Sequence, residues 1–191
     1  MSTSLQVAFL TGQSHPASCA LSPAQEAFLD RLALPDVAVV RRNFPYGDVT
    51  PPYRDVALLA ASWNNTRQYW RSRTIDFANR HRPDVVRLID RADCTVLLAG
   101  SCGLELLTNL DLRAEDLARL RVFAYGAVAR RRPACDVFAV LGRRDWIARA
   151  FGGPIDAAVD CGHMDYLETP DVLTLCRSFI ANVAGRSRVS A

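Results

Sequence analysis

Six short apolar runs of strand length alternate along the chain with longer stretches of helical pattern, and this alternation restricts the fold more than any other feature. The runs are rich in β-branched and aromatic residues and are apolar at consecutive positions, which is typical of strands covered on both faces. We therefore predict an α/β fold, a three-layer, doubly wound and mostly parallel sheet of about six strands with helices on both faces. The expected strands are 5–10, 37–40, 94–99, 121–126, 136–141 and 155–160.

Helical patterns fill most of the intervals between these runs. The first expected helix, 22–34, has Ser22 as its N-cap, Pro23 at the first helical position and Gln25 in place to complete a capping box. A second helix is expected at 104–110. The last expected helix, 165–185, ends the domain with Gly185 as its C-cap.

Two intervals fit the alternation less well. Residues 43–93 form one long excursion between the second and third strands, rich in turns at first and then helical, with an expected break at Pro83. The interval 127–135, between the fourth and fifth strands, is barely long enough for a parallel crossover. This interval is either a bare loop or the sign of a misplaced strand end.

The chain of 191 residues suits a single domain, which we place at 1–185, with 186–191 as a flexible tail. No apolar stretch approaches the ~18 residues that span a bilayer, and the first residues lack a basic secretory signal. We therefore expect a cytoplasmic protein that does not bind membranes.

Six cysteines without a C-x-x-C pair and three histidines predict neither disulfides nor a metal site, and no cofactor motif is present. A net charge of +3 is too small to indicate nucleic-acid binding.

Residues able to carry chemistry follow four of the expected strands. In a parallel sheet the carboxyl ends of the strands share one edge, where ligands bind. The segments after the first, third, fifth and sixth strands read TGQSHP, AGSCG, GRRD and CGHMD. Nucleophilic acyl transfer needs a nucleophile on a sharp turn, a histidine to take its proton, a carboxylate to orient the histidine and N–H groups facing the oxyanion. All four parts are available at these strand ends.

In these segments the chain resembles the α/β-hydrolase superfamily, and the resemblance covers nearly the whole sequence. The family's nucleophile elbow is G-x-S-x-G between a strand and a helix, with serine, acid and histidine following in that order. The segment AGSCG at 99–103 departs from the motif only in its first residue, where alanine is still small enough for the turn. The resemblance implies Ser101 as nucleophile, Asp145 as acid and His163 as general base.

Ser101 and Cys102 are both chemically able to act as the nucleophile, and the register of the turn distinguishes them. With Ser101 at the apex, the residues two before and two after it are Ala99 and Gly103, both small. With Cys102 at the apex, Leu104 would crowd the neighbouring strand. The register therefore favours Ser101.

The resemblance also implies an oxyanion hole. The N–H of Cys102 is one expected donor, because the residue after the nucleophile supplies it. Gln13, in the loop after the first strand, is the other expected donor, with Gly12 allowing close approach of the backbone. His15, in the same loop, is a candidate substrate contact or an ordinary surface residue.

Each of these assignments also has a plainer explanation. Small residues are common between strands and helices, Asp145 could be a surface ion pair or a helix cap, and a single histidine such as His163 is more often structural. Asp160 and Asp165 are alternative acids but lie too near the histidine in sequence for the usual geometry. The joint occurrence of the three residue types at strand ends favours the triad.

The superfamily's lid is usually inserted where this chain has only the short segment 126–136. Arg130, Arg131 and Arg132 are therefore expected near the mouth of the site. One hypothesis is that they bind an anionic substrate or carrier, such as coenzyme A or an acyl carrier protein. A solvated loop explains the same arginines equally well.

The excursion 43–93 is a candidate replacement for the lid, with aromatic residues lining the site. The expected lining residues are Tyr46, Tyr53, Trp63 and Trp70, and an amphipathic helix explains the tryptophans and interleaved arginines better than nucleic-acid binding does. The sequence thus predicts a serine hydrolase that cleaves a small-molecule ester or thioester through an acyl-enzyme. The alternatives are an acyltransferase with the same triad and a non-catalytic binding or scaffold protein of this fold.

Overall fold

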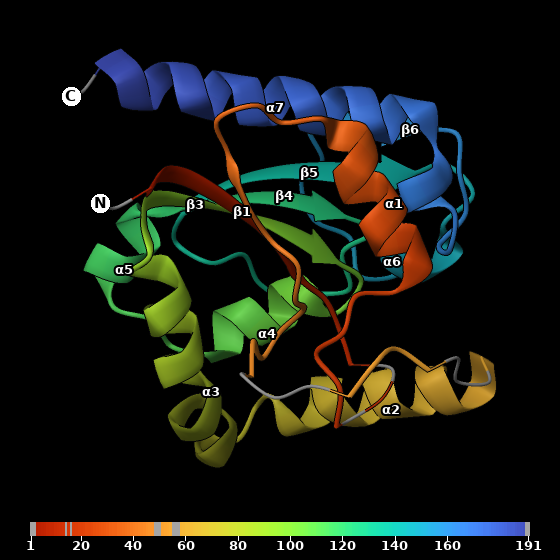
Figure 1. The fold of residues 1–191 in the computed structure, drawn as a ribbon. Coiled ribbons are helices and arrows are strands. Elements are labelled where there is room, and N and C mark those ends of the chain that lie inside the picture. Colours follow the sequence, from red (N-terminus) through yellow and green to blue (C-terminus); the bar gives the residue numbers. More distant parts are fainter. Residues whose placement is uncertain (1–2, 14, 16, 48–50, 55–57, 190–191) are drawn as a thin grey trace.

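A parallel β-sheet forms the centre of the molecule (Figure 1). The computed structural model describes residues 3–13, 15, 17–47, 51–54 and 58–189. Within them the sheet has six strands in the order β2-β1-β3-β4-β5-β6, and every neighbouring pair is parallel. The predicted α/β fold and all six predicted strand positions are confirmed. The strands are β1 Thr3–Leu10, β2 Ala38–Val40, β3 Ala92–Gly100, β4 Leu120–Tyr125, β5 Asp136–Gly142 and β6 Ala157–Val159.

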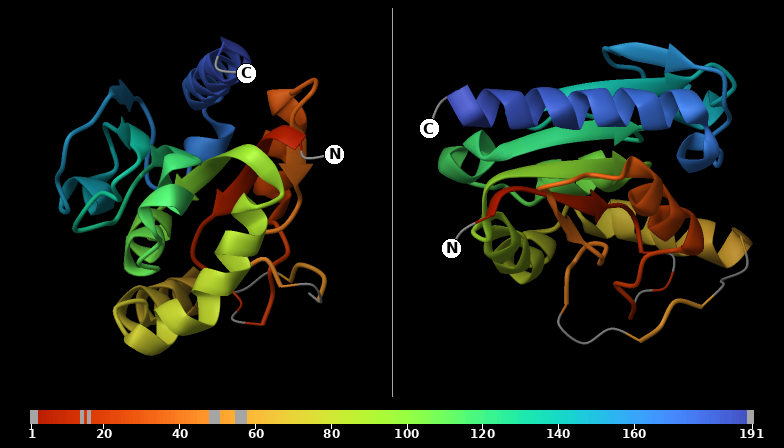
Figure 2. Two further views of the ribbon diagram at one scale, coloured as in Figure 1. Left: turned by 90° about the vertical axis from the view of Figure 1, so that its left-hand side faces the viewer. Right: turned by 45° about the horizontal axis from the view of Figure 1, so that its top comes forward.

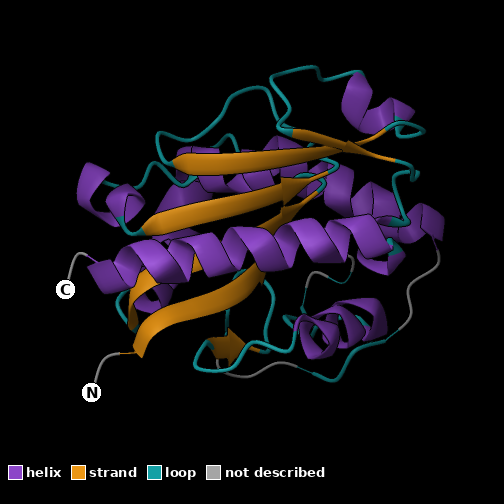
Figure 3. Cartoon of the chain, turned by 90° about the horizontal axis from the view of Figure 1, so that it is seen from above, coloured by secondary structure: helices purple, strands orange, loops and turns teal. Residues whose placement is uncertain are grey.

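Helices cover both faces of the sheet and give the three layers (Figures 1 and 2). The helices α1 and α7 lie on one face, and α7 runs along the sheet when seen from above (Figure 3). The helices α3, α4 and α5 lie on the other face, and α2 lies on that same side of the sheet, extending from below α4 past the carboxyl ends of the strands. The helices are α1 Pro23–Leu32, α2 Leu58–Arg71, α3 Ile75–Ile89, α4 Gly103–Asn109, α5 Ala114–Ala118, α6 Trp146–Arg149 and α7 Pro170–Val189, with a 3-10 helix at Tyr166–Glu168.

Strand β3 shows why the predicted strands are apolar at consecutive positions. Its side chains alternate between two separate cores, because successive residues of a strand point to opposite faces. Val96 and Leu98 pack with α1 and α7, whereas Leu97 and Ala99 pack with α3 and α4. A strand between two cores needs apolar side chains on both faces.

The predicted start of α1 is confirmed in detail. The Ser22 hydroxyl accepts a hydrogen bond from the Gln25 N–H at 3.2 Å, and the Gln25 side chain accepts one from the Ser22 N–H at 2.8 Å. This reciprocal capping box satisfies two backbone donors at the helix N-terminus. It also fixes where the chain leaves the loop that follows β1.

Two predicted helix ends are wrong. Helix α3 continues through Pro83, because the buried side chains of Phe77 and Val85 on either side of it outweigh the ~3 kcal/mol that an interior proline costs. Helix α7 continues through Gly185, which does not have a positive φ, and ends at Val189. Residues 186–189 of the predicted tail are therefore helical, and residues 190–191 lie outside the described residues.

The interval between β4 and β5 is a bare loop, as one of the two sequence interpretations proposed. Helices α5 and α6 were not predicted, because four or five residues are too few to show a helical period.

No helix in the described part of the chain is both long and apolar enough to cross a membrane. All strands point the same way, so the turns after β1, β3, β5 and β6 meet at one edge of the sheet.

Candidate active site

The turn between β3 and α4 holds Ser101 in a strained backbone conformation. Ser101 has φ +51°, in the left-handed region that non-glycine residues rarely adopt. Its N–H donates to the Tyr125 carbonyl at 3.2 Å, and its carbonyl accepts from the Val128 N–H at 2.8 Å. Gly103 completes the turn, because a Cβ there would lie 1.9 Å from the Leu10 carbonyl oxygen. Both features are typical of a turn that presents one side chain at a sheet edge.

The structure brings Ser101, His163 and Asp145 together in one chain of hydrogen bonds. The Ser101 Oγ lies 3.1 Å from His163 Nε2, and His163 Nδ1 lies 2.9 Å from Asp145 Oδ2. The histidine side chain is 17% exposed and the aspartate side chain is fully buried. One ring nitrogen can therefore accept the serine proton while the other stays hydrogen-bonded to the carboxylate.

Asp145 is the N-cap of α6 as well as the partner of the histidine. Its Oδ1 accepts from the Ala148 N–H at 2.9 Å, and its Oδ2 accepts from His163 and from the Tyr166 hydroxyl. Burial alone would raise the pKa of Asp145, but these hydrogen bonds together hold it below the usual value. The carboxyl is therefore ionised and fixed in orientation. Asp160 and Asp165 do not take part in this chain of hydrogen bonds.

Tyr166 is a site residue that the sequence reasoning missed. Its hydroxyl donates to Asp145 Oδ2 at 2.8 Å and accepts from the Gly142 N–H at 2.7 Å. Burial raises the pKa of Tyr166, which keeps the hydroxyl protonated and able to donate. The one available signal in the sequence was that Tyr166 follows His163 by three residues. Otherwise this aromatic residue looks like an ordinary core residue.

The environment of Cys102 agrees with its assignment as a backbone donor rather than a nucleophile. The residue is 4% exposed, and burial raises the pKa of its thiol to about 12 against the opposing effect of nearby N–H groups of Cys102 and Gly12. A buried neutral thiol is a poor nucleophile. Cys102 is the N-cap of α4, so its N–H is one of the helix-end donors without an acceptor inside the helix.

The loop after β1 lies against α2, and the predicted second oxyanion donor is already engaged there. The Gln13 N–H donates to Gln68 Oε1 at 2.7 Å, and the Gln68 Nε2 donates back to Gln13 Oε1 at 3.2 Å. Gly12 is closely surrounded, because a Cβ would lie 2.6 Å from Asn65 Oδ1 and 2.8 Å from the Cys102 sulfur. No sequence signal indicated a contact with Gln68, which is 55 residues from Gln13.

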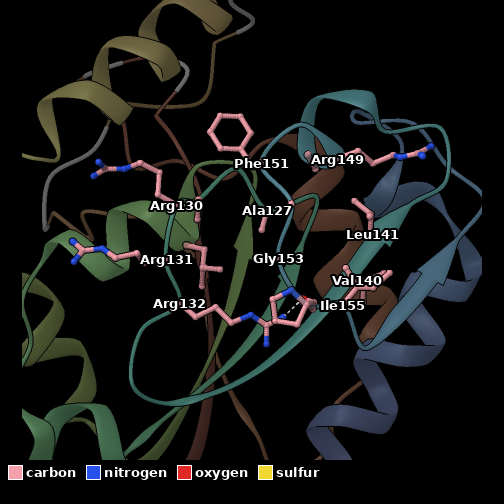
Figure 4. A pocket seen from close by; sticks show the side chains of 16 residues that line it. Ala127, Arg130, Arg131, Arg132, Val140, Leu141, Arg149, Phe151, Gly153 and Ile155 are labelled. Atoms are coloured by element: carbon pink, nitrogen blue, oxygen red, sulfur yellow. Dashed lines mark hydrogen bonds between the residues drawn. The ribbon is translucent and has the colours of Figure 1, made fainter.

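A cavity of about 370 Å³ lies beside the serine turn, between the β4–β5 loop and the segment after α6 (Figure 4). Its walls are mainly apolar and include Leu104, Ala127, Phe151 and Ile155. Ala127 precedes Val128, whose N–H binds the Ser101 carbonyl, so the cavity adjoins the turn although Ser101 is not part of its wall. A mainly apolar hollow of this size is typical of a small-molecule site.

The three arginines expected at the mouth do line this cavity, but they differ in what they bind. Arg130 pairs with the buried carboxylate of Glu105, and Arg132 donates to the Pro154 carbonyl across the cavity. Figure 4 shows the guanidinium groups of Arg130 and Arg131 directed away from Val140, Leu141 and Ile155 on the opposite wall. Among the described residues, Arg131 has no acidic partner.

The excursion 43–93 does not line the cavity with the expected aromatic residues. Tyr46 is part of the hydrophobic core, and its hydroxyl donates to the Phe9 carbonyl at 2.8 Å, so its predicted role in the wall is wrong. Full burial stabilises an aromatic ring more than a place at an open wall, provided that its hydroxyl finds a partner. Trp63 is 69% exposed and lies outside the cavity wall, as do Tyr53 and Trp70.

His15 lies away from the serine, where it lines a separate hollow of about 140 Å³ with Pro51, Pro52 and Arg54. The described residues contain no group of three or more His, Cys, Asp or Glu side chains placed to hold a metal ion.

Comparisons with known proteins identify the fold and nothing beyond it. No protein-family model matches the chain, and no curated protein matches it. Among solved structures, the chain is similar to a protein of unknown function from Agrobacterium tumefaciens str. C58, with 16% identity and a TM-score of 0.50. The likeness covers 95% of this chain and 92% of that one, so it extends over the whole sheet.

Proposed function

We propose that the protein is a serine hydrolase of the α/β-hydrolase type that cleaves an ester or thioester through an acyl-enzyme intermediate. The observation that carries the proposal is the unbroken hydrogen-bond chain from Ser101 through His163 to Asp145, with the serine on a left-handed turn at the sheet edge. A structural histidine needs no serine hydroxyl on its second nitrogen, and a structural serine needs no strained φ. Their combination is what nucleophilic acyl transfer requires.

The proposed reaction runs in two halves. The Ser101 Oγ attacks the acyl carbonyl while its proton passes to His163 Nε2, and the buried Asp145 carboxylate stabilises the charged imidazole. The Cys102 N–H faces the oxyanion, the C–O or C–S bond breaks, and His163 returns the proton to the leaving group. Water then attacks the acyl-enzyme with the same histidine as base, which releases the acid and restores Ser101.

The proposed substrate is a small molecule whose acyl part enters the cavity beside the serine turn. The apolar walls favour a hydrocarbon chain. The exposed Arg131, at the edge of this cavity, supports an anionic leaving group such as coenzyme A or a phosphopantetheinyl carrier protein. We place this activity in the cytoplasm, with neither metal nor redox cofactor taking part.

The test is labelling by a fluorophosphonate probe, followed by mass spectrometry of the adduct. The wild type should be labelled on Ser101, and Ser101→Ala should lose both labelling and hydrolysis of p-nitrophenyl esters by about a thousandfold or more. Cys102→Ala is the matched control, because it removes the neighbouring thiol and keeps the backbone N–H. Labelling that survived in Ser101→Ala and vanished in Cys102→Ala would contradict the serine assignment. A wild type that hydrolyses no acyl length would contradict the proposed activity.

A further inference from the structure

The side chain of Arg132 joins the two walls of the cavity beside the serine turn. One wall is the loop 127–132, and the other is the segment 151–155 after α6. The Arg132 guanidinium donates to the Pro154 carbonyl and lies 3.8 Å from the Asp156 carboxylate. Figure 4 shows this side chain extended across the space between the walls. In the described part of the chain, no other hydrogen bond joins these two walls, so Arg132 forms a bridge over the cavity.

The acidic partner of this bridge is fixed on the sheet. Asp156 Oδ2 accepts from the Ala139 N–H at 2.8 Å, and the Asp156 N–H donates to the Ala139 carbonyl at 2.8 Å. Ala139 belongs to β5 and itself lines the cavity. A chain that enters the cavity therefore meets a side chain held by two acceptors rather than one that is free in solvent.

The bridge lies at the end of the cavity that is farther from the serine. Ala127 is the wall residue next to the serine turn, because the following residue, Val128, donates its N–H to the Ser101 carbonyl. Arg132 comes five residues later in the same loop, and Figure 4 shows its guanidinium apart from Ala127. An acyl chain attached to Ser101 would therefore pass Ala127 before it reaches the bridge.

We propose that Arg132 sets the longest acyl chain that the enzyme accepts, and that its substrates are medium-chain esters or thioesters. This inference rests on the proposed function. At ~30 Å³ for each group the size of a methylene, the cavity of about 370 Å³ holds on the order of ten carbon atoms. A chain of that size buries its methylene groups against the apolar walls and ends before the bridge. A longer chain must displace Arg132 from its acceptors or leave its end in water.

The bridge thus acts on long chains alone. It contacts neither Ser101 nor His163, so an acyl group too short to reach Arg132 is bound and attacked in the same way whether the bridge is present or not. Beyond the bridge, the side chain of Ile155 lines the cavity and is 50% exposed. It offers apolar surface to the end of a longer chain once Arg132 is removed.

The experiment compares kcat/KM for p-nitrophenyl acetate, octanoate and myristate in one detergent-containing buffer. The wild type should hydrolyse the octanoate best. In Arg132→Ala we expect the myristate value to rise by about tenfold or more, because each newly buried methylene group contributes about fourfold. The acetate and octanoate values should change by less than about threefold. The gain should come from a lower KM with kcat unchanged, because the bridge does not touch the reacting atoms.

Arg82→Ala is the matched control, because Arg82 has the same kinds of partner away from the cavity. Arg82 donates to the Leu110 carbonyl at 2.8 Å and to Asp111 at 3.3 Å, and its side chain is 32% exposed, against 31% for Arg132. It should match the wild type at every chain length. If Arg132→Ala does not fold, as judged by circular dichroism, Arg132→Met, which also lacks the donors, takes its place.

A second readout separates a barrier from a general loosening of the loop. Trifluoromethyl ketones with the same two longer chains should show the same pattern, with tighter inhibition of Arg132→Ala by the C14 compound and little change for the C8 compound. An equal change at all chain lengths would overturn the inference and show that Arg132 only holds the loop.

Failure of the proposed function gives a different result. If neither the wild type nor Arg132→Ala hydrolyses an ester in a Ser101-dependent way, the proposed function and this inference are both wrong. If the wild type is active but already prefers the myristate, or if its chain-length profile is the same in Arg132→Ala, only the inference is wrong.

Discussion

Replacing Tyr166 by Phe removes one hydroxyl from the support of the proposed triad and leaves the ring in place. The hydroxyl donates to the ionised Asp145 at 2.8 Å and accepts from the buried Gly142 N–H at 2.7 Å. A hydrogen bond to a charged group contributes about 1.5–3 kcal/mol, and a buried N–H left without an acceptor costs about 1–3 kcal/mol. We expect Tyr166→Phe to lower the free energy of unfolding by about 2–4 kcal/mol, or the Tm by about 5–15 °C for a chain of this size.

The loss should depend on pH, because the hydroxyl stabilises the ionised carboxylate. The folded pKa of Asp145 is held low, so its contribution to stability is present above the unfolded value of about 3.9 and disappears as pH falls through the lower folded value. Tyr166→Phe raises the folded pKa and reduces that contribution. The difference in stability between wild type and variant should therefore be largest at neutral pH and smaller near pH ~3.

Urea unfolding at both pH values measures the effect. Tyr125→Phe is the matched control, because its ring lies 5.7 Å from that of Tyr166 and its hydroxyl is not among the donors to Asp145. It should cost less than about 1 kcal/mol and show no dependence on pH. A loss in Tyr166→Phe of the same size at both pH values would refute the reasoning, since it would come from packing rather than from the carboxylate.

Further predictions concern the turn, the helices and the buried acid. Gly103→Ala should lower the free energy of unfolding by about 3 kcal/mol or more, because the new Cβ meets the Leu10 carbonyl, and urea unfolding checks this. Gly185→Ala, with no atom within 4 Å of the new Cβ, should instead raise the Tm through a gain of about 0.5–1 kcal/mol. Glu105→Gln should destabilise by about 2 kcal/mol at neutral pH and less in acid, because partner groups hold the pKa of this carboxyl low. Cys102→Ala should keep ester hydrolysis within about fivefold of the wild type, since only its backbone N–H is used.

The sheet and its order of elements could be predicted because their causes are local in the sequence. Strand β3 must be apolar at consecutive positions to fill two cores, and that pattern is visible in 94–99 without any knowledge of the partners. The N-terminus of α1 could be predicted for the same reason, since Ser22 and Gln25 cap each other. The helix across Pro83 could not, because its local cost is visible and the burial that offsets it comes from distant segments.

The residues of the candidate site also divide into those that the sequence could predict and those that it could not. The sequence placed Ser101, Asp145 and His163 at strand ends, and the parallel sheet brings such ends together without further information. Tyr166 and Gln68 could not be assigned roles, because each acts through a hydroxyl or amide whose partner is distant in sequence. A tyrosine in an apolar pattern and a glutamine on a helix have many ordinary positions, and only the tertiary contacts show which of them lie at the candidate site.

Asp145 shows that a structural role and a chemical role need not be alternatives. A carboxylate has two oxygens, and here Oδ1 caps α6 through Ala148 while Oδ2 faces His163 and Tyr166. The cap fixes the rotation of the carboxyl group, and that rotation directs Oδ2 at the imidazole. The helix-cap explanation of Asp145 is thus correct, and it is also the means by which the carboxylate can orient a histidine. A short helix after β5 is therefore part of the geometry on which the proposed acyl transfer depends.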